Sequence, residues 1–288
     1  MPQSSLKSTG RFDTICIVGV GLIGGSLAAA VKQRQLAGRI LGVGRNLPRL
    51  QSAQQAGLID DCLVDLSAAA AESDLIVFCT PVDKIVTGVR EAAAHCRPGT
   101  LMTDGGSTKG AICAAVTGSL PADVHFVGAH PLAGSEKQGF EHANADLYQD
   151  RICVVTPHDD SDPAAVSQVS AFWRQVGMTV IEMSPEEHDN ILAETSHVPH
   201  LVASALAATL RDETRPLTSS GFRDTTRIAA GDEQLWAAIF QGNKTAMLAG
   251  LDQFETQLRE LRGAIERDDT ETLVQTLRTA REKRETLE

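Results

Sequence analysis

No apolar run in this 288-residue sequence approaches the ~20 residues that a helix needs to cross a bilayer. The first ten residues, MPQSSLKSTG, are polar and lack the apolar segment of a secretory signal peptide. We therefore expect a cytoplasmic protein without a membrane partner. With 42% hydrophobic and 22% charged residues, the chain has an ordinary globular composition and is long enough for two domains.

Basic residues are also scarce. The sequence has 26 Lys and Arg but 37 Asp and Glu, so its formal net charge is −11. Nucleic-acid binding requires clustered Lys and Arg, so we expect no nucleic-acid partner. An anionic small molecule would have to be held by local basic groups, since the overall field repels it. The six cysteines include no C-x-x-C pair, which favours reduced core thiols over a metal or redox site.

Residues 14 to 183 alternate between short apolar runs and stretches with helical spacing at 22–35, 82–95 and 107–117. Seven runs are typical of strands: TICIVG (14–19), RILGVG (39–44), DLIVFCT (74–80), TLMTDG (100–105), HFVGAH (125–130), RICVVTP (151–157) and MTVIEM (178–183). Such strands, separated by helices, indicate a mostly parallel sheet that is covered on both faces. We predict a doubly wound, Rossmann-type α/β domain over residues 1–183.

The pattern changes after Met183, where SPEE (184–187) combines a capping Ser, a Pro at the first helical position and a Glu at the third. No convincing strand follows, so we predict an all-helical domain over residues 184–288. Six apolar residues in this domain are spaced alternately four and three positions apart: Met247, Leu251, Phe254, Leu258, Leu261 and Ile265. The stripe fits either packing within a helical bundle or a seam between two subunits.

A G-x-G-x-x-G pattern lies directly after the first predicted strand and before a helix, with Gly19, Gly21 and Gly24 as its glycines. The first glycine allows a tight turn, the second lets a pyrophosphate approach the backbone, and the third permits close packing of helix on strand. The first turn of the helix, with Leu22 and Ile23, offers unpaired N–H groups and the positive end of the helix dipole. We therefore predict a dinucleotide site here.

The second predicted strand ends LGVGRN (41–46), where an NAD site usually has an Asp or Glu that binds the ribose hydroxyls. This sequence has Arg45 instead, and an arginine can pair with a 2′-phosphate. NADP is therefore favoured, and NAD remains possible if Arg45 only stacks on the adenine. Asn46, and Thr80 with Pro81 at the end of another strand, are further candidates for cofactor contacts.

His130 follows the predicted strand HFVG in the stretch VGAHPLAG (127–134), and Ser107 and Lys109 follow another strand in TDGGSTKG (103–110). Because the carboxyl ends of parallel strands meet at one edge, the glycine turn, Ser107 and His130 should converge there. A neutral imidazole at that place can accept a proton as a hydride leaves a substrate. From the residues alone, His130 could also simply satisfy backbone groups in a glycine-rich turn.

Five stretches together resemble the prephenate/arogenate dehydrogenase family, in the order and context found in its members: GVGLIGGS (19–26), DGGSTK (104–109), GAHPLAGSEKQG (128–139), HDNILAETSHVPH (188–200) and GFRDTTRIAAGDEQLW (221–236). The resemblance spans roughly residues 14 to 266, and Ala129 replaces a glycine that many members have. It implies oxidative decarboxylation of a cyclohexadienol to a 4-hydroxyphenyl product, a step towards tyrosine. His130 would accept the 4-hydroxyl proton while hydride passes to the nicotinamide, and Ser107 would orient both His130 and the substrate hydroxyl.

The resemblance further implies a substrate anchor in GFRDTTR (221–227). Arg227 would clamp a substrate carboxylate, with Arg223 and Asp224 nearby, and Ser135 and Glu136 would belong to the polar surroundings at the entrance. By spacing alone, the two arginines are four apart and would share one helix face, where they could also be ordinary solvated charges.

His197 and His200 lie three apart around Pro199 and can face one side of a kinked helix. No carboxylate or third histidine has convincing companion spacing, so we expect no metal, and the pair belongs either to the substrate pocket or to hydrogen bonds of the core. His200 favours prephenate over arogenate. His188 is expected to be structural, and Trp236 either walls the pocket or packs in the core.

The arginines and the histidine pair belong to the helical domain and His130 to the sheet domain, so the site should lie in the cleft between them. Family members dimerise through their helical domains, which implies a homodimer seam along the stripe from Met247 to Ile265.

A β-hydroxyacid dehydrogenase, with Lys244 as its lysine, is one alternative, and a non-catalytic dinucleotide-sensing module is another. For a His130 base of ordinary pKa, turnover should fall below about pH 6.5.

Overall fold

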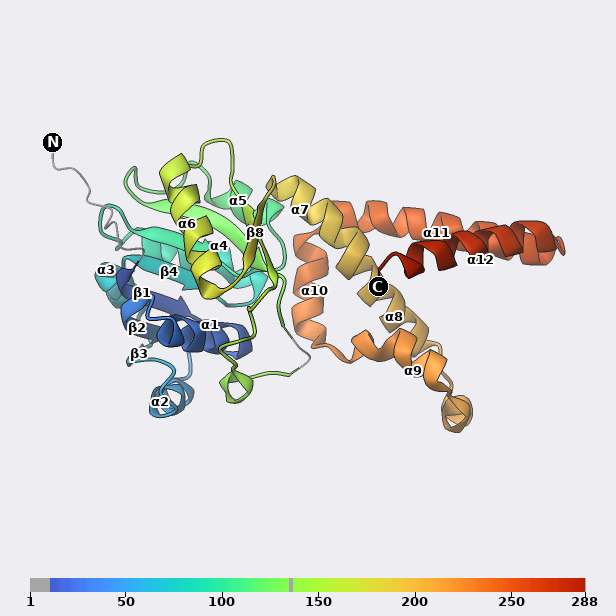
Figure 1. Ribbon diagram of the computed structural model, residues 1–288, viewed down its shortest axis with the longest axis horizontal. Coiled ribbons are helices and arrows are strands. Elements are labelled where there is room, and N and C mark those ends of the chain that lie inside the picture. Colours follow the sequence, from blue (N-terminus) through green and yellow to red (C-terminus); the bar gives the residue numbers. More distant parts are fainter. Residues whose placement is uncertain (1–10, 135–136, 288) are drawn as a thin grey trace.

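The computed structural model describes residues 11–134 and 137–287, and its first part is one eight-stranded sheet in the order β3-β2-β1-β4-β5-β6-β7-β8 (Figure 1). The strands are β1 (Phe12–Val18), β2 (Ala37–Val43), β3 (Asp61–Leu63), β4 (Leu75–Phe78), β5 (Leu101–Asp104), β6 (His125–Pro131), β7 (Ile152–Thr156) and β8 (Thr179–Glu182). All neighbours pair in parallel except β6 and β7. The strand order reverses at β1 and β4, where sheets of this kind bind ligands beyond the carboxyl ends.

The sheet matches the predicted fold class, and the seven predicted strands are present. The eighth, β3, has only three residues and pairs with β2 alone at the edge of the sheet, so it leaves no alternation to detect. The antiparallel pairing of β6 with β7 was likewise not expected from the sequence.

Helices cover both faces of the sheet: α1 (Leu22–Gln33), α2 (Leu47–Gln55), α3 (Leu66–Glu72), α4 (Val82–Ala93), α5 (Gly110–Val116) and α6 (Pro163–Val176). Successive residues of β1 point to opposite sides. Ile15 and Ile17 join the apolar cluster under α1 and α6, whereas Cys16 joins the cluster under α3 and α4. The apolar character of both strand faces therefore reflects two separate cores.

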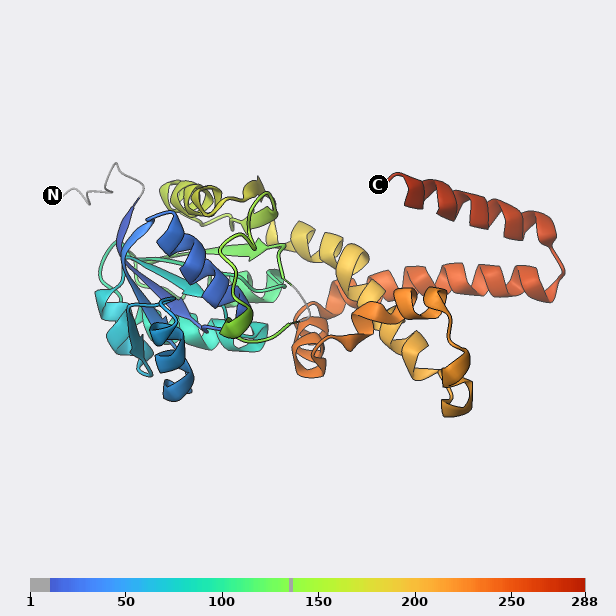
Figure 2. The ribbon, with the colours of Figure 1, turned by 60° about the horizontal axis from the view of Figure 1, so that its bottom comes forward.

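The chain after β8 is helical to the end of the described residues: α7 (Pro185–Leu192), a π-helical turn (Ala193–His197), α8 (Val198–Ala208), α9 (Ser220–Thr226), α10 (Glu233–Gly242), α11 (Lys244–Glu266) and α12 (Thr270–Glu285). Short 3-10 turns lie at Phe140–His142, Asp212–Leu217 and Arg227–Ala230. Ser184 caps α7 as predicted, since its side chain accepts a hydrogen bond from the N–H of Glu187 at 3.1 Å. The hairpin of α11 and α12 extends away from the sheet (Figure 2).

No helix among the described residues is long and apolar enough to cross a membrane. All six cysteines are free thiols, and Cys16, Cys113 and Cys153 are buried, whereas the other three are only partly buried. Burial raises the pKa of both Cys16 and Cys79 to about 12, so these thiols stay protonated.

Candidate active site

The glycine turn after β1 has the geometry that close approach to a phosphate requires. Gly19 has a φ of +94°, and a Cβ there would lie 2.8 Å from the carbonyl oxygen of Cys79. A Cβ on Gly24 would lie 2.1 Å from the carbonyl oxygen of Gly19, so only glycine lets α1 pack this closely on the turn. A Cβ on Gly21, in contrast, would meet no atom within 4 Å. The turn is therefore tight towards the sheet and open where a pyrophosphate would sit.

Unpaired donors and one unpaired hydroxyl lie near this turn. Gly21 caps α1 without a side-chain hydrogen bond, so the N–H groups of Leu22 and Ile23 have no partner within the helix. Thr80 lies beside Gly19, and its buried hydroxyl has no hydrogen-bond partner among the described residues. A buried hydroxyl left without a partner calls for a group that binds it. These features fit a dinucleotide cofactor.

The residues after β2 are arranged around the start of α2. Arg45 is exposed, whereas the side-chain oxygen of Asn46 accepts from the N–H of Arg49 at 3.0 Å and caps the helix. Arg49 in turn forms an ion pair with Glu141 at 3.2 Å. Arg45 is thus an exposed basic side chain that can contact a cofactor, whereas Arg49 is already paired with Glu141. Pro81 is exposed and stands at the start of α4.

A fully buried ion pair joins Asp104, at the end of β5, to Lys109. The Asp104 carboxylate also accepts from the N–H of Gly106 at 2.9 Å and from the N–H of Ala129 at 3.0 Å. The Lys109 ammonium donates to the carbonyl oxygen of Ala129 at 3.0 Å. The loop that carries Ser107 is therefore fixed to the residue that precedes His130.

His130, on β6, is partly accessible and contacts a second histidine. Its Nδ1 lies 2.9 Å from Nε2 of His188, and Nδ1 of His188 lies 2.8 Å from a carboxylate oxygen of Asp189. Both partners are buried on α7. Sequence reasoning assigned His188 only a structural part, although it stands in HDNILAETSHVPH (188–200), one of the family-like stretches.

Asp189 connects the sheet to the helices. Its two carboxylate oxygens accept from the N–H groups of Lys109 and Gly110, both at 2.8 Å, and so cap α5. Its carbonyl oxygen accepts from the side-chain amide of Asn243 at 2.6 Å, and the same amide nitrogen lies 3.1 Å from Nδ1 of His197. A continuous hydrogen-bonded network therefore runs from His130 on β6 to His197 in the helical part.

Burial keeps these imidazoles neutral. It lowers the pKa of His130 well below 6.5, and the electrostatic influence of His188 and Lys109 lowers it further. Burial lowers the pKa of His197 to about 4 and also that of His188, where the hydrogen bond to Asp189 opposes it. This lowering of the pKa favours a neutral His130 imidazole near neutral pH, which is the form that can accept a proton.

His197 and His200 are both buried, on a helix that contains one π turn. This turn (Ala193–His197) and Pro199 in the first turn of α8 form the irregularity that the sequence predicted as a kink. The ring of His200 stacks on Trp236 with centroids 3.5 Å apart, and its buried Nδ1 has no hydrogen-bond partner in the described part of the chain. Trp236 also meets the ring of His197 at 6.3 Å, so it walls the space around the pair.

The predicted anchor residues lie apart from this network. Arg223 and Asp224 on α9 and Arg227 at the following 3-10 turn are exposed, and this turn packs against α8, which carries His200. Within the described residues, no hydrogen bond joins Arg227 or Ser107 to His130. Ser135 and Glu136 lie outside the described residues.

Comparison with known proteins points to one family. The model of the prephenate dehydrogenase nucleotide-binding domain matches residues 27–182, and that of the prephenate dehydrogenase dimerization domain matches residues 184–279. Prephenate dehydrogenase of Bacillus subtilis (strain 168) is 33% identical over 96% of this chain and 76% of that protein. Cyclohexadienyl dehydrogenase of Zymomonas mobilis is 31% identical over 95% of each. The crystal structure of prephenate dehydrogenase from A. aeolicus with hydroxyphenyl propionate and NAD+ has a TM-score of 0.92 and 32% identity, covering 98% of this chain and 100% of that one.

Proposed function

The chain belongs to the prephenate dehydrogenase family, and we propose that it catalyses the NAD(P)-dependent oxidative decarboxylation of prephenate to 4-hydroxyphenylpyruvate. The observation that carries this proposal is the place of His130 near the carboxyl end of β6, beside His188, at the same edge of the sheet as the glycine turn after β1. Arogenate, which has an amino group in place of the keto group, is the second candidate substrate. The relative named cyclohexadienyl dehydrogenase supports keeping it in the test.

In this proposal each residue has one task. His130 accepts the proton of the substrate 4-hydroxyl, and Ser107 orients that hydroxyl from the neighbouring strand end. The bound nicotinamide supplies the hydride acceptor. Arg227 holds a substrate carboxylate, with Arg223 and Asp224 beside it, while His197 and His200 line the pocket. The ring carboxylate leaves as carbon dioxide, and aromatisation makes the reaction irreversible.

The cofactor would bind at the glycine turn, where Gly21 and the N–H groups of Leu22 and Ile23 would hold its pyrophosphate. The Thr80 hydroxyl, which has no partner among the described residues, would form a further hydrogen bond to it. We propose NADP as the preferred cofactor, because Arg45 is exposed beyond β2 where it can pair with a 2′-phosphate. Tighter binding of NAD than of NADP would contradict this preference.

Steady-state kinetics with two substrates and two cofactors test the function. Prephenate or arogenate is mixed with NAD or NADP, and the absorbance of the reduced cofactor is followed. Turnover of either cyclohexadienol supports the proposal. The substrate with the higher kcat/KM decides between prephenate and arogenate. Turnover of a β-hydroxy acid instead would indicate the other enzyme class, and no turnover of any of them would leave a dinucleotide-sensing module.

The Arg227→Ala variant should raise the KM for prephenate with little change in kcat. A lost charged hydrogen bond costs about 1.5–3 kcal/mol, which corresponds to roughly a 10- to 150-fold increase in KM. Arg215→Ala is the matched control, since Arg215 is also an exposed arginine near α9 and pairs with Asp212. An unchanged KM in the Arg227 variant would argue against the clamp.

The pH profile of kcat should be flat from about pH 8 to about 6.5 and should fall only at lower pH. The active form of His130 is neutral, and burial lowers its pKa well below 6.5, so protonation removes the base only in more acidic solution. The structure thus moves the acid limb below the value that an ordinary histidine predicts. An acid limb at or above pH 6.5, with the protein shown to remain folded, would be the contrary result.

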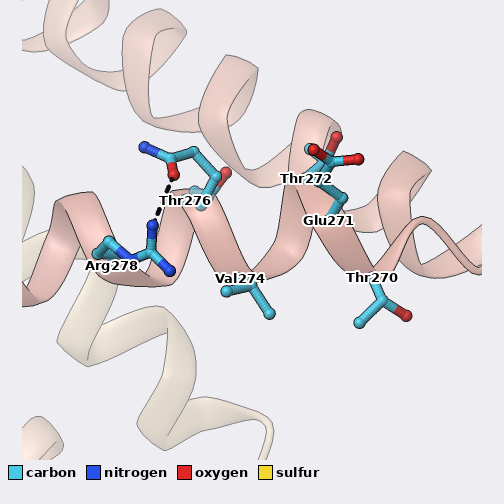
Figure 3. Close-up of a pocket in the computed structure, with 7 residues that line it drawn as sticks. Thr270, Glu271, Thr272, Val274, Thr276 and Arg278 are labelled. Carbon is cyan, nitrogen blue, oxygen red and sulfur yellow. Dashed lines mark hydrogen bonds between the residues drawn. The ribbon is translucent and has the colours of Figure 1, made fainter.

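We also propose that two copies associate through the hairpin of α11 and α12. Met247 at the start of the apolar stripe is buried, but Leu258 and Ile265 further along α11 are 55% and 64% exposed. Leu277 on α12 is 62% exposed. A surface pocket on the same helix is lined by residues between Thr270 and Arg278 (Figure 3). Thr270 and Val274 project from one side of α12 within this pocket. Exposed apolar surface on a projecting hairpin is typical of a subunit interface.

A charge placed on this surface should weaken the dimer. We expect the native protein to have twice the chain mass of 30.6 kDa in light scattering, and Leu258→Glu to shift the population towards monomer. The control is Lys84→Glu on α4, an exposed site far from the hairpin in sequence. A native protein that is monomeric at micromolar concentration, or a Leu258 variant with unchanged mass, would exclude this interface.

A further inference from the structure

We infer that Asp189 and His188 are positioning residues that hold His130 in a single tautomer, with the proton on Nδ1 and the free electron pair on Nε2. The inference rests on the proposed function in one respect, because it names Nε2 as the atom that accepts the substrate proton. It goes beyond that function, because it states that two residues of α7 set the tautomer of His130 on β6. Ser107 is not needed for this assignment.

The direction of each hydrogen bond follows from what each group can donate. The Asp189 carboxylate accepts from the N–H groups of Lys109 and Gly110, so the ring nitrogen at 2.8 Å, Nδ1 of His188, must be the donor to it. Neutral His188 then has its electron pair on Nε2. Since this atom lies 2.9 Å from Nδ1 of His130, the proton between them belongs to His130.

The second nitrogen of His130 has the opposite character. Because Nδ1 carries the proton, Nε2 of a neutral ring has the free electron pair and can act as a base. His130 is partly accessible, and its Nε2 makes no hydrogen bond within the described residues. The reverse tautomer would place the proton on Nε2 and leave this nitrogen unable to accept one. A carboxylate that fixes the tautomer of a catalytic histidine performs the same task in hydrolases, and here a second imidazole lies between the two.

The network also makes the base depend on contact between the two parts of the chain. His188 and Asp189 are fully or nearly fully buried, and they reach His130 and the start of α5 only when α7 lies against the sheet edge. Lys109 also lies near this edge, and its ammonium is bound by Asp104 and by the carbonyl oxygen of Ala129. Its ammonium therefore does not compete for either nitrogen of His130.

Nitrogen NMR of the full-length protein labelled with ¹⁵N-histidine tests the tautomer directly. The chain has eight histidines, and the His130 signals are identified by their loss in His130→Asn. In the native protein near neutral pH, we expect the shift of a protonated nitrogen at Nδ1 and that of an unprotonated one at Nε2. A proton on Nε2 of His130 in the native protein would overturn the inference, whichever substrate the enzyme turns over.

Two substitutions of His188 then test its part. His188→Leu has no acceptor, so the His130 signals should change towards a mixture of tautomers, and kcat should fall by about 10- to 100-fold with little change in KM. His188→Gln keeps an oxygen that can accept from Nδ1 of His130 and should recover most of the native tautomer and turnover. A folded Leu variant with native His130 signals would refute the positioning role. If the native protein gives the expected His130 signals but has no dehydrogenase activity, only the proposed function is refuted.

Discussion

Replacing His130 by Asn should lower kcat by roughly 10²- to 10⁴-fold, the range for a lost general base, and leave cofactor binding intact. The asparagine amide can still donate to Nε2 of His188, so the buried network on α7 keeps a partner. It has no basic nitrogen to accept the hydroxyl proton. The kcat is measured by steady-state kinetics with prephenate, and the Kd for NADP or NAD by titration of the free protein.

The matched control is His95→Asn, an exposed histidine that follows α4 and lies outside the network. Its kcat should equal that of the native enzyme. A His130 variant whose kcat stays within threefold of the native value would remove this residue from the chemistry. A variant that also loses cofactor binding would instead indicate a damaged sheet edge, which a thermal melt would reveal.

The sheet, the glycine turn and the start of the helical part could be predicted because their signals are local. Gly19, Gly21 and Gly24 are each required by the backbone within a few residues. The structure shows the expected surroundings at all three positions. The Ser184 cap is equally local. In contrast, β3 was not predicted, because a strand of three residues is too short to show a periodic pattern of apolar residues.

The partners of His130 could not be predicted, because they depend on how distant segments pack. His188 lies 58 positions further along the chain, and its contact exists only because α7 crosses the carboxyl edge of the sheet. The same holds for Asp189, which caps a helix that starts about 80 positions earlier. A sequence pattern reports the periodicity of one element, and it does not report which face of another element it will meet.

The Lys109→Met variant should lose about 3–5 kcal/mol of unfolding free energy, because it leaves the buried Asp104 carboxylate without its counter-charge. Both side chains of this pair are completely inaccessible to solvent. The remaining donors to Asp104 are the N–H groups of Gly106 and Ala129, which are neutral. Urea unfolding at a fixed protein concentration measures the loss, since dimer formation would make the midpoint depend on concentration.

A double-mutant cycle with Asp104→Asn separates the ion pair from general damage to the core. Asparagine removes the charge but keeps an acceptor oxygen for only one of the two backbone N–H groups, which bond different oxygens of Asp104. Because no uncompensated buried charge remains, the double variant should still be more stable than the sum of the two single losses predicts. Additive losses would mean that the pair contributes nothing beyond its packing. Because Lys109 also holds the carbonyl oxygen of Ala129, next to His130, kcat should stay depressed in the double variant even where stability recovers. The pair would then fix the position of the base as well as the fold around it.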